Sequence, residues 1–338
     1  MLKKNVTMSD IAKALNVSTV TVSKALGGRE GVSEALRERI KRKAEDMGYK
    51  FRRGENVFPE GSTYNIGIVV EKSVFGDPSS LCWELYRNIV ELLRKQNFYG
   101  MLEVFDGSGG AAELPSVLKD EKVDGLILLG QFPGEYIERL EEFYVPVVFL
   151  DQSRSRTDSD MIISDSFFGG YTLTSYLILN GHRRIGFIGD INGSPGVRER
   201  YLGFYKALLE NHLVLRNEWV FSVDPHHFGA FELPAESPSG MPTAFVCGND
   251  ETAYRLVNLL ADNHISVPEN ISVVGYDNHT YSTMCRPHLT TMDINSPRLA
   301  EEAVDMLLHK IRDRGFSGGI KLVAGKLVRR DSVKNLLA

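Results

Sequence analysis

Several polar side chains lie at the ends of short apolar runs of this 338-residue chain or at the start of the helical pattern that follows such a run. They are Asp151, Asp165, Arg198, Arg200, Asn249 and Asp277. A carboxylate accepts several hydrogen bonds and a guanidinium donates a fork, so together these groups suit the vicinal hydroxyls of a sugar. Because ligands of open α/β sheets lie beyond the carboxyl ends of the strands, the sequence predicts a polar binding site there.

Other kinds of chemistry find little support in the residues. Gly107-Ser108-Gly109-Gly110 is a glycine-rich loop after an apolar run, but it lacks the Lys-Ser/Thr pair of a P-loop and the spacing of a dinucleotide fingerprint. The sequence shows neither a nucleophile–base pair nor a Cys/His cluster with zinc-ligand spacing, and adjacent histidines such as His226 and His227 are usually solvated. We therefore expect no catalytic residue, no metal and no cofactor. An α/β enzyme is a disfavoured alternative.

Short apolar strands alternate with helical patterns from Tyr64 onward, which predicts an α/β fold with parallel sheets. A first series of strands covers residues 66–70, 101–105, 125–129 and 147–150, and a second covers 161–163, 185–188, 220–223, 244–247 and 272–275. Helical patterns cover residues 82–96, 169–180, 197–211, 251–263 and 298–312, and Asp250 is expected to cap the fourth. Two similar series indicate two lobes with the polar site in a cleft between them.

The first fifty residues predict a different element, a helix-turn-helix. Thr7 and Ser18 are placed to cap two short helices, and Ser33 to cap a third that ends near Met47. In this motif the second helix enters the major groove of DNA. Its outward face consists of Thr19, Val20, Ser23 and Lys24.

The distribution of charge supports a DNA-binding segment. Residues 1–53 contain 13 basic and 6 acidic side chains, whereas the rest of the chain contains 26 basic and 38 acidic ones. A basic module on an acidic body fits one surface that meets phosphate and another that does not. Three widely spaced cysteines, no long apolar run and no signal-like N-terminus predict a cytoplasmic protein with reduced thiols and no membrane contact.

Motifs along nearly the whole chain resemble LacI/GalR-family transcriptional regulators. In the first fifty residues they are Val17-Ser18-x-x-Thr21-Val22-Ser23-Lys24-x-Leu26, Gly31-Val32-Ser33 and Met47-Gly48-Tyr49. Further along they are Asn180-Gly181-His182-Arg183, Gly248-Asn249-Asp250, the stretch from Val267 to Asn278, and Pro287-x-Leu289-Thr290-Thr291. The resemblance implies a three-helix headpiece followed by a two-lobed, periplasmic-binding-protein-like body. It also implies a homodimer on a palindromic operator.

Roles in DNA binding follow from the motif and the resemblance. Thr19 and Val20 are expected to read base edges, while phosphates are expected to be held by Ser18, Thr21 and Ser23, with Thr7, Lys24 and Ser33 completing the interface. In the family a hinge helix inserts an apolar wedge into the minor groove, and this position falls at Phe58. The linker departs from the family pattern, because Gly54 and Pro59 disfavour a helix there. Phe58 is therefore either a wedge or part of a plain linker.

For the body, the resemblance implies effector contacts at Arg200, Asn249 and Asp277, with Asp151 lining the pocket. Phe75 and Trp83 follow the first strand and are candidates for stacking on a sugar ring, although Trp83 also fits core packing. The loops after the first strand and around residues 225–241 depart from the family pattern. A purine or a phosphorylated metabolite is therefore the alternative to a sugar.

The sequence thus predicts a headpiece at residues 1–50, a linker at 51–63 and an effector-binding and dimerisation domain at 64–338. Its lobes are expected to cover 64–163 plus 293–322, and 164–292 plus 323–338. The predicted function is a transcriptional repressor whose operator affinity a small effector changes, in a direction that the residues leave open. A sugar-transport binding protein is a further alternative, which the headpiece disfavours.

Overall fold

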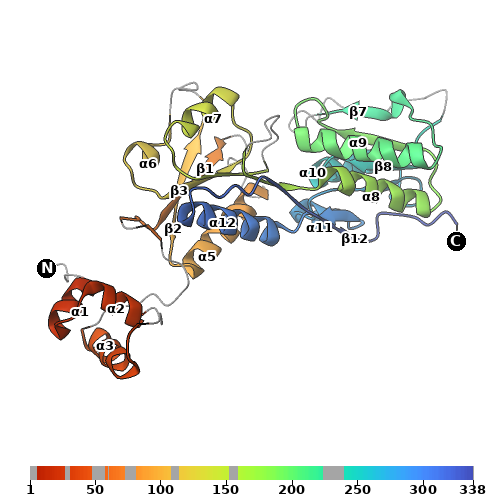
Figure 1. Cartoon of the computed structure of the whole chain (residues 1–338). Helices are drawn as coiled ribbons and strands as arrows, with labels where there is room; N and C mark the ends of the chain where they lie inside the picture. Colours follow the sequence, from red (N-terminus) through yellow and green to blue (C-terminus); the bar gives the residue numbers. More distant parts are fainter. Residues whose placement is uncertain are drawn as a thin grey trace. The chain divides into compact units, whose positions relative to one another are not determined.

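The computed structural model describes residues 6–26, 31–47, 58–59, 61–72, 81–107, 114–151, 159–223 and 240–337. It divides the chain into two compact units, Met1–Glu60 and Gly61–Ala338, here called the headpiece and the body (Figure 1). The division falls inside the segment 51–63 that the sequence analysis treats as a linker.

Within the described residues the headpiece has three helices, α1 (Met8–Leu15), α2 (Thr19–Leu26) and α3 (Glu34–Asp46). Ile11, Val22 and Ile40, one from each helix, are fully buried in a shared core. Asn16 ends α1 in a left-handed conformation with φ 53°, and Val17 N then donates to Ala12 O at 3.0 Å. The tight turn predicted between the first two helices is confirmed.

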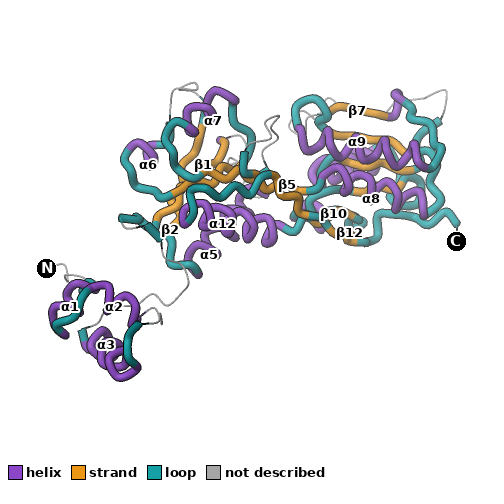
Figure 2. Tube along the Cα trace, in the orientation of Figure 1, coloured by secondary structure: helices purple, strands orange, loops and turns teal. Residues whose placement is uncertain are grey.

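A six-stranded parallel sheet forms the first lobe of the body (Figure 2). In spatial order its strands are β11 (Ile320–Val323), β5 (Met161–Ser164), β4 (Val147–Leu150), β3 (Gly125–Leu129), β1 (Asn65–Glu71) and β2 (Tyr99–Phe105). The helices of this lobe are α5 (Leu81–Lys95), α6 (Ser116–Lys119), α7 (Gly134–Glu141) and α12 (Ser296–Arg312). Helix α12 packs on α5 and on the central strands.

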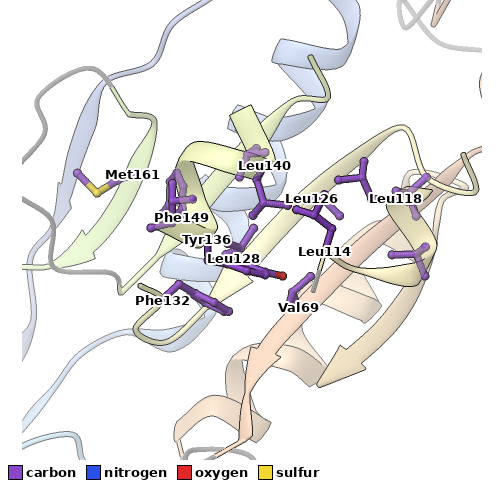
Figure 3. Close-up of a cluster of buried hydrophobic side chains, with 14 residues drawn as sticks. Val69, Leu114, Leu118, Leu126, Leu128, Phe132, Tyr136, Leu140, Phe149 and Met161 are labelled. Atoms are coloured by element: carbon purple, nitrogen blue, oxygen red, sulfur yellow. The ribbon is translucent and has the colours of Figure 1, made fainter. Parts of the chain in front are cut away.

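One face of this sheet packs against α6 and α7 and forms a hydrophobic core with them (Figure 3). Leu126 and Leu128 alternate along β3 and point toward Tyr136 of α7, which is 1% exposed. Phe149 of β4 and Val69 of β1 extend the same cluster across the sheet. Burial on both faces explains why these strands read as continuous apolar runs.

The second lobe has a four-stranded parallel sheet in the order β7 (Val220–Ser222), β6 (Ile185–Gly189), β8 (Ala244–Cys247) and β9 (Ser272–Val274). Helices α8 (Ser166–Leu179), α9 (Pro195–Glu210), α10 (Asp250–Asp262) and α11 (Thr280–Met284) belong to it, with the short 3₁₀ helix η2 (Asn217–Trp219). Helices α8 and α9 pack closely along each other. Gly203 permits this, since a Cβ there would lie 1.9 Å from Phe167 O.

Three connections of the chain join the lobes. The chain first passes from β5 to α8, and it returns from the antiparallel strand β10 (Thr291–Asp293) to α12. After β11 it crosses again into β12 (Lys326–Val328), the partner of β10. The cysteines Cys82, Cys247 and Cys285 are free and buried.

Two expectations about the elements are corrected by the structure. The strand at 161–163 is expected in the second series, although the expected bounds of the first lobe include it, and β5 pairs with β4 and β11 and therefore belongs to the first sheet. The short elements α6, α7, α11, η2, β10, β11 and β12 were not predicted. Most of them are too short to show a hydrophobic period that a sequence reading could detect.

Candidate functional site

Arg200 is the centre of the polar site in the second lobe. Helix α9 begins after Ser194, whose hydroxyl accepts from Val197 N at 3.4 Å, and it carries Arg200 into the lobe, where the residue is buried. Its Nη1 donates to Gly248 O at 2.5 Å and its Nε to Ser166 Oγ at 3.4 Å. The remaining Nη2 lies 3.3 Å from Asp277 Oδ1, so all three guanidinium nitrogens have partners.

The ring of Tyr276 stacks against Arg200, whose guanidinium carbon lies 3.7 Å from the ring centroid. This fully buried tyrosine is possible because Gly169 of α8 leaves room, since a Cβ there would lie 2.4 Å from the phenol oxygen. Gly170 is equally constrained, because its Cβ would lie 2.1 Å from Arg200 O. The glycine pair in α8 thus sets the depth at which the arginine and its stacking partner lie.

Asp277 follows β9, and its backbone has a φ of 104°, which L-residues rarely adopt. Strand β10 holds it there, since Asp277 N donates to Met292 O at 2.8 Å. Its Oδ1 is buried and makes no hydrogen bond within the described part of the chain, apart from the ionic contact with Arg200. Burial raises the pKa of this carboxyl to about 6, with Arg200 opposing the rise and the carboxylates of Asp151 and Glu84 adding to it.

Asp151 lies in the first lobe at the end of β4, also with a positive φ of 59°. Its N donates to Ile162 O at 2.9 Å and its carbonyl accepts from Gln131 Nε2 at 2.8 Å, so the backbone is fixed while the residue is exposed. Desolvation by the surrounding protein raises the pKa of the Asp151 carboxyl, and Arg200 lowers it. Arg200 thus acts electrostatically on the carboxyls of both Asp277 and Asp151.

Three other predicted site residues make local hydrogen bonds to the backbone. Asn249 is the N-cap of α10, with Oδ1 accepting from Thr252 N at 2.8 Å, and Asp165 caps α8 by accepting from Phe168 N at 3.1 Å. Arg198 is exposed and donates to the carbonyls of Ile191 and Asn192 in the loop before its helix. These hydrogen bonds are local to the helix starts, and the roles of the three residues in effector binding stay predictions.

The expectation that Asp250 caps α10 is wrong by one residue. Asp250 is buried at the first helical position, where its Oδ1 accepts from Thr291 Oγ1 at 2.6 Å and its Oδ2 from His279 N at 2.8 Å. It therefore ties α10 to β10 and to the start of α11. The pKa of this carboxyl is raised well above its ordinary range, chiefly by burial and then by Asp277.

Of the two aromatic candidates, only Trp83 lies among the described residues. Phe75 lies outside the described residues. Trp83 is half-buried on α5 and packs edge-to-face against Tyr86, with ring centroids 5.8 Å apart. Its neighbour Glu84, which the sequence analysis missed, accepts a hydrogen bond from Ser296 Oγ at the start of α12 and contributes charge at Asp277. An ordinary helical glutamate gives no signal of such a role.

The headpiece presents the expected polar and apolar groups on its surface. Thr7 and Asp10 form a reciprocal capping box, and Ser18 Oγ accepts from Thr21 N at 3.0 Å. Val20 is 64% exposed on α2, so its methyl groups are accessible to a partner. Other predicted contacts on the surface are Thr19, Lys24 and Ser33, whereas Thr21 and Phe58 are half-buried and the side chain of Ser23 lies outside the described ones.

Arg37 of α3 is a headpiece residue that the sequence analysis missed. Its Nη1 donates to Ala25 O at 3.2 Å and reaches Lys24 O at 3.5 Å, which satisfies carbonyls at the end of α2. Because α2 carries the predicted reading face, Arg37 helps to fix its orientation. A positively charged residue in a basic helix gives no sequence signal that separates this role from a phosphate contact.

Two family models match the chain. Residues 7–50 match the model for bacterial regulatory proteins of the lacI family, and residues 174–333 match that for a periplasmic binding protein-like domain. A transcriptional repressor PurR from Pectobacterium atrosepticum is 30% identical over 97% of this chain and 96% of its own length. The PurR repressor of Aliivibrio salmonicida is 29% identical over 98% of this chain and 99% of its own.

Solved structures agree with this fold. A complex of the transcriptional regulator CelR with cellobiose has a TM-score of 0.69 at 23% identity, covering 97% of this chain and 100% of that one. A LacI-family regulator from Enterococcus faecium with bound ribose has a TM-score of 0.66 at 26% identity, covering 80% and 99%.

A helix-turn-helix headpiece, a two-lobed α/β body and relatives that are repressors along their whole length define a DNA-binding transcriptional repressor rather than an enzyme. More narrowly, the chain belongs to the LacI family. In the part of the chain that the structure describes, no helix has the length and apolar character needed to cross a membrane.

Proposed function

We propose that this repressor responds to a small, neutral, hydroxyl-rich effector held by Asp277, Arg200 and Asp151. The observation that carries the proposal is the buried Asp277 Oδ1, which has an ionic contact with Arg200 and no hydrogen bond among the described residues. A buried carboxylate oxygen without a hydrogen-bond donor is costly, so a ligand that donates to it would be bound favourably. A sugar hydroxyl is such a donor.

The charges of the site disfavour a phosphorylated effector. Asp151, Asp277 and Glu84 act together electrostatically, while the nitrogens of Arg200 are already bonded to Gly248, Ser166 and Asp277. A phosphate would bring negative charge to a group of carboxylates whose cation is occupied. A neutral ligand avoids this repulsion.

A purine is the second candidate effector. Its ring N–H groups could donate to the same two carboxylates, and two relatives that match along nearly the whole chain are PurR repressors. The ribose bound to the Enterococcus faecium regulator supports a sugar instead. We favour the sugar, since two carboxylates from different lobes suit a ring with hydroxyls on both sides.

DNA reading belongs to the surface of α2 in the headpiece. Val20 is expected to pack on a thymine methyl beside Thr19, and the hydroxyls of Ser18 and Thr21 are expected to hold phosphates. One helix of eight residues reaches few base pairs. A homodimer on a palindromic operator is therefore proposed, because two half-sites give the affinity that one lacks.

A binding screen tests the effector. The melting temperature of the full-length protein is measured with ribose, cellobiose and other sugars, with purine bases, and with sugar phosphates, since a ligand that binds the folded state raises it. We expect a shift with a neutral sugar that Asp277→Asn abolishes and that the exposed control Asp262→Asn keeps. If only a purine raises the melting temperature, the effector is a purine and not a sugar. A shift with a phosphate alone, or one that Asp277→Asn retains, would refute the proposed site.

A further inference from the structure

Asp124 lies just before β3, beside the point where the chain enters the body. Its carboxylate accepts three hydrogen bonds from the two residues that precede the first strand. Oδ1 accepts from Thr63 N at 2.7 Å and from Thr63 Oγ1 at 3.0 Å, and Oδ2 accepts from Tyr64 N at 2.7 Å. Both carboxylate oxygens are thus committed to one short stretch of chain, which is called the entry segment below and comprises Thr63, Tyr64 and Asn65.

The entry segment is also attached to the strands on both sides of β1. Toward β2, Tyr64 O accepts from Tyr99 N at 2.9 Å, and the Tyr64 ring packs at 5.3 Å from that of Phe98. Toward β3, Asn65 Nδ2 donates to Lys122 O at 3.0 Å, and Asp124 N donates to Asn65 O at 2.8 Å. The segment is therefore held in position along its whole length.

The backbone of Tyr64 shows that this attachment imposes a conformation. Its φ is 60°, in the left-handed region that a bulky aromatic residue rarely occupies. Such a conformation persists only where the surroundings over-determine it, and it is often found where a direction of the chain matters for function. Here all three donors to Asp124 come from Thr63 and from the backbone N of Tyr64 itself.

We propose that Asp124 is a positioning residue for operator binding. By holding Thr63 and Tyr64 it fixes the place and direction in which the linker leaves the body, and with them the spacing of the two headpieces in a dimer. The inference rests on the proposed function, because it needs a dimer that reads two half-sites. Tyr64 and Asn65 have other partners, but Thr63 would lose the hydrogen bonds that Asp124 accepts from its N and Oγ1. The tether that holds each headpiece would then begin later in the chain, so operators of incorrect spacing would be rejected less strictly.

The test measures discrimination between operator spacings. Full-length wild type first enriches a palindromic duplex from a random-sequence library, and its affinity is compared with that for the same palindrome with base pairs inserted at the centre. The variant Asp124→Asn keeps the size of the side chain, but its amide nitrogen replaces one acceptor oxygen. The matched control Asp120→Asn makes the same change of charge at a surface residue whose side chain bonds only Lys122 Nζ, at 2.6 Å, among the described contacts.

We expect the ratio of the two affinities to fall about tenfold in Asp124→Asn, the change that loss of one charge-assisted hydrogen bond supports. Affinity for a single half-site should be unchanged in that variant, and the ratio should be unchanged in Asp120→Asn. A merely structural role for Asp124 would not alter the ratio. An unchanged ratio in folded Asp124→Asn, or an equal fall in Asp120→Asn, would overturn the proposal.

If Asp124→Asn does not fold, Thr63→Val removes one of the three donors and should lower the ratio in the same direction, and a folded Thr63→Val with the wild-type ratio would overturn the proposal. The failure of the proposed function is a separate result. It would appear as a wild type that enriches no palindrome, and the positioning role would fall with it. A wild type that discriminates between spacings no better than Asp124→Asn refutes the positioning role alone.

Discussion

Effector affinity should fall as the pH falls through about 6, because the effector is proposed to donate to the ionised Asp277. Burial raises the pKa of this carboxyl to about 6 in the folded protein, so protonation begins well above the ordinary range of aspartate. A protonated carboxyl has lost an acceptor site and carries its own donor. The ligand would then compete with a proton for the same oxygen.

The size of the effect follows from that pKa. For one titrating group at about 6, binding at pH 5 should be about tenfold weaker than at pH 7.5, or ~1.4 kcal/mol. The stability of the ligand-free protein should depend on pH in the opposite direction and fall as the pH rises. Because the pKa of Asp277 is raised on folding, this carboxyl contributes stability below its unfolded pKa, and that contribution is lost as the pH rises through about 6.

The affinity is measured by isothermal titration at a series of pH values. The ligand is the sugar that gives the largest thermal shift. Asp277→Asn should bind weakly at every pH and show no such slope. Asp151→Asn should keep the slope but move its midpoint to lower pH, because the Asp151 carboxylate contributes to the raised pKa of Asp277. Wild-type affinity that is constant between pH 5 and 7.5, or a slope that survives in Asp277→Asn, would refute the reasoning.

Two further predictions concern the supports of the site. Gly170→Ala should destabilise the body by about 1–3 kcal/mol in urea unfolding and weaken effector binding, because its Cβ would lie 2.1 Å from Arg200 O. The control Gly134→Ala, with nothing within 4 Å of the added carbon, should be neutral or stabilising, and equal effects of the two would contradict the packing argument. Asn249→Ala should cost about 1 kcal/mol of stability through its lost cap and leave effector affinity nearly unchanged, whereas Asn249→Ser should restore the stability. A loss of affinity in both Asn249 variants would instead make this residue an effector contact.

The position of Asp277 could be predicted because strand ends are recognisable in the sequence, whereas Arg200 lies within helix α9 and its role is implied only by the family resemblance. A polar residue after a buried apolar run must lie at the edge of a parallel sheet, whatever the details of packing. The same logic could not distinguish Asn249 from Asp250, because a shift of one residue decides which side chain caps α10 and which is buried. Pattern reading does not locate the end of an element to within one residue.

Tyr276 and Asp124 show what lies beyond a reading of the sequence. Tyr276 reads as the last apolar residue of a strand, and only the packing of Gly169 against its ring reveals it as the support of Arg200. The partners of Asp124 are sixty residues away in the chain, at Tyr64 and its neighbour. Contacts of this kind depend on which strands are neighbours, and β1 pairs with β3 only in the folded sheet.

The order of the strands has a consequence for how the protein is made. The edge strand β11 and the covering helix α12 of the first lobe come from the end of the chain, whereas the sheet of the second lobe is complete at Val274. The second lobe also needs the last residues of the chain, since Ser332 O accepts from Val273 N at 3.0 Å. During synthesis both lobes are therefore completed only after most of the chain has left the ribosome. The headpiece is a compact unit that needs only the first sixty residues. A newly made chain should thus acquire its DNA-reading surface long before it can sense an effector.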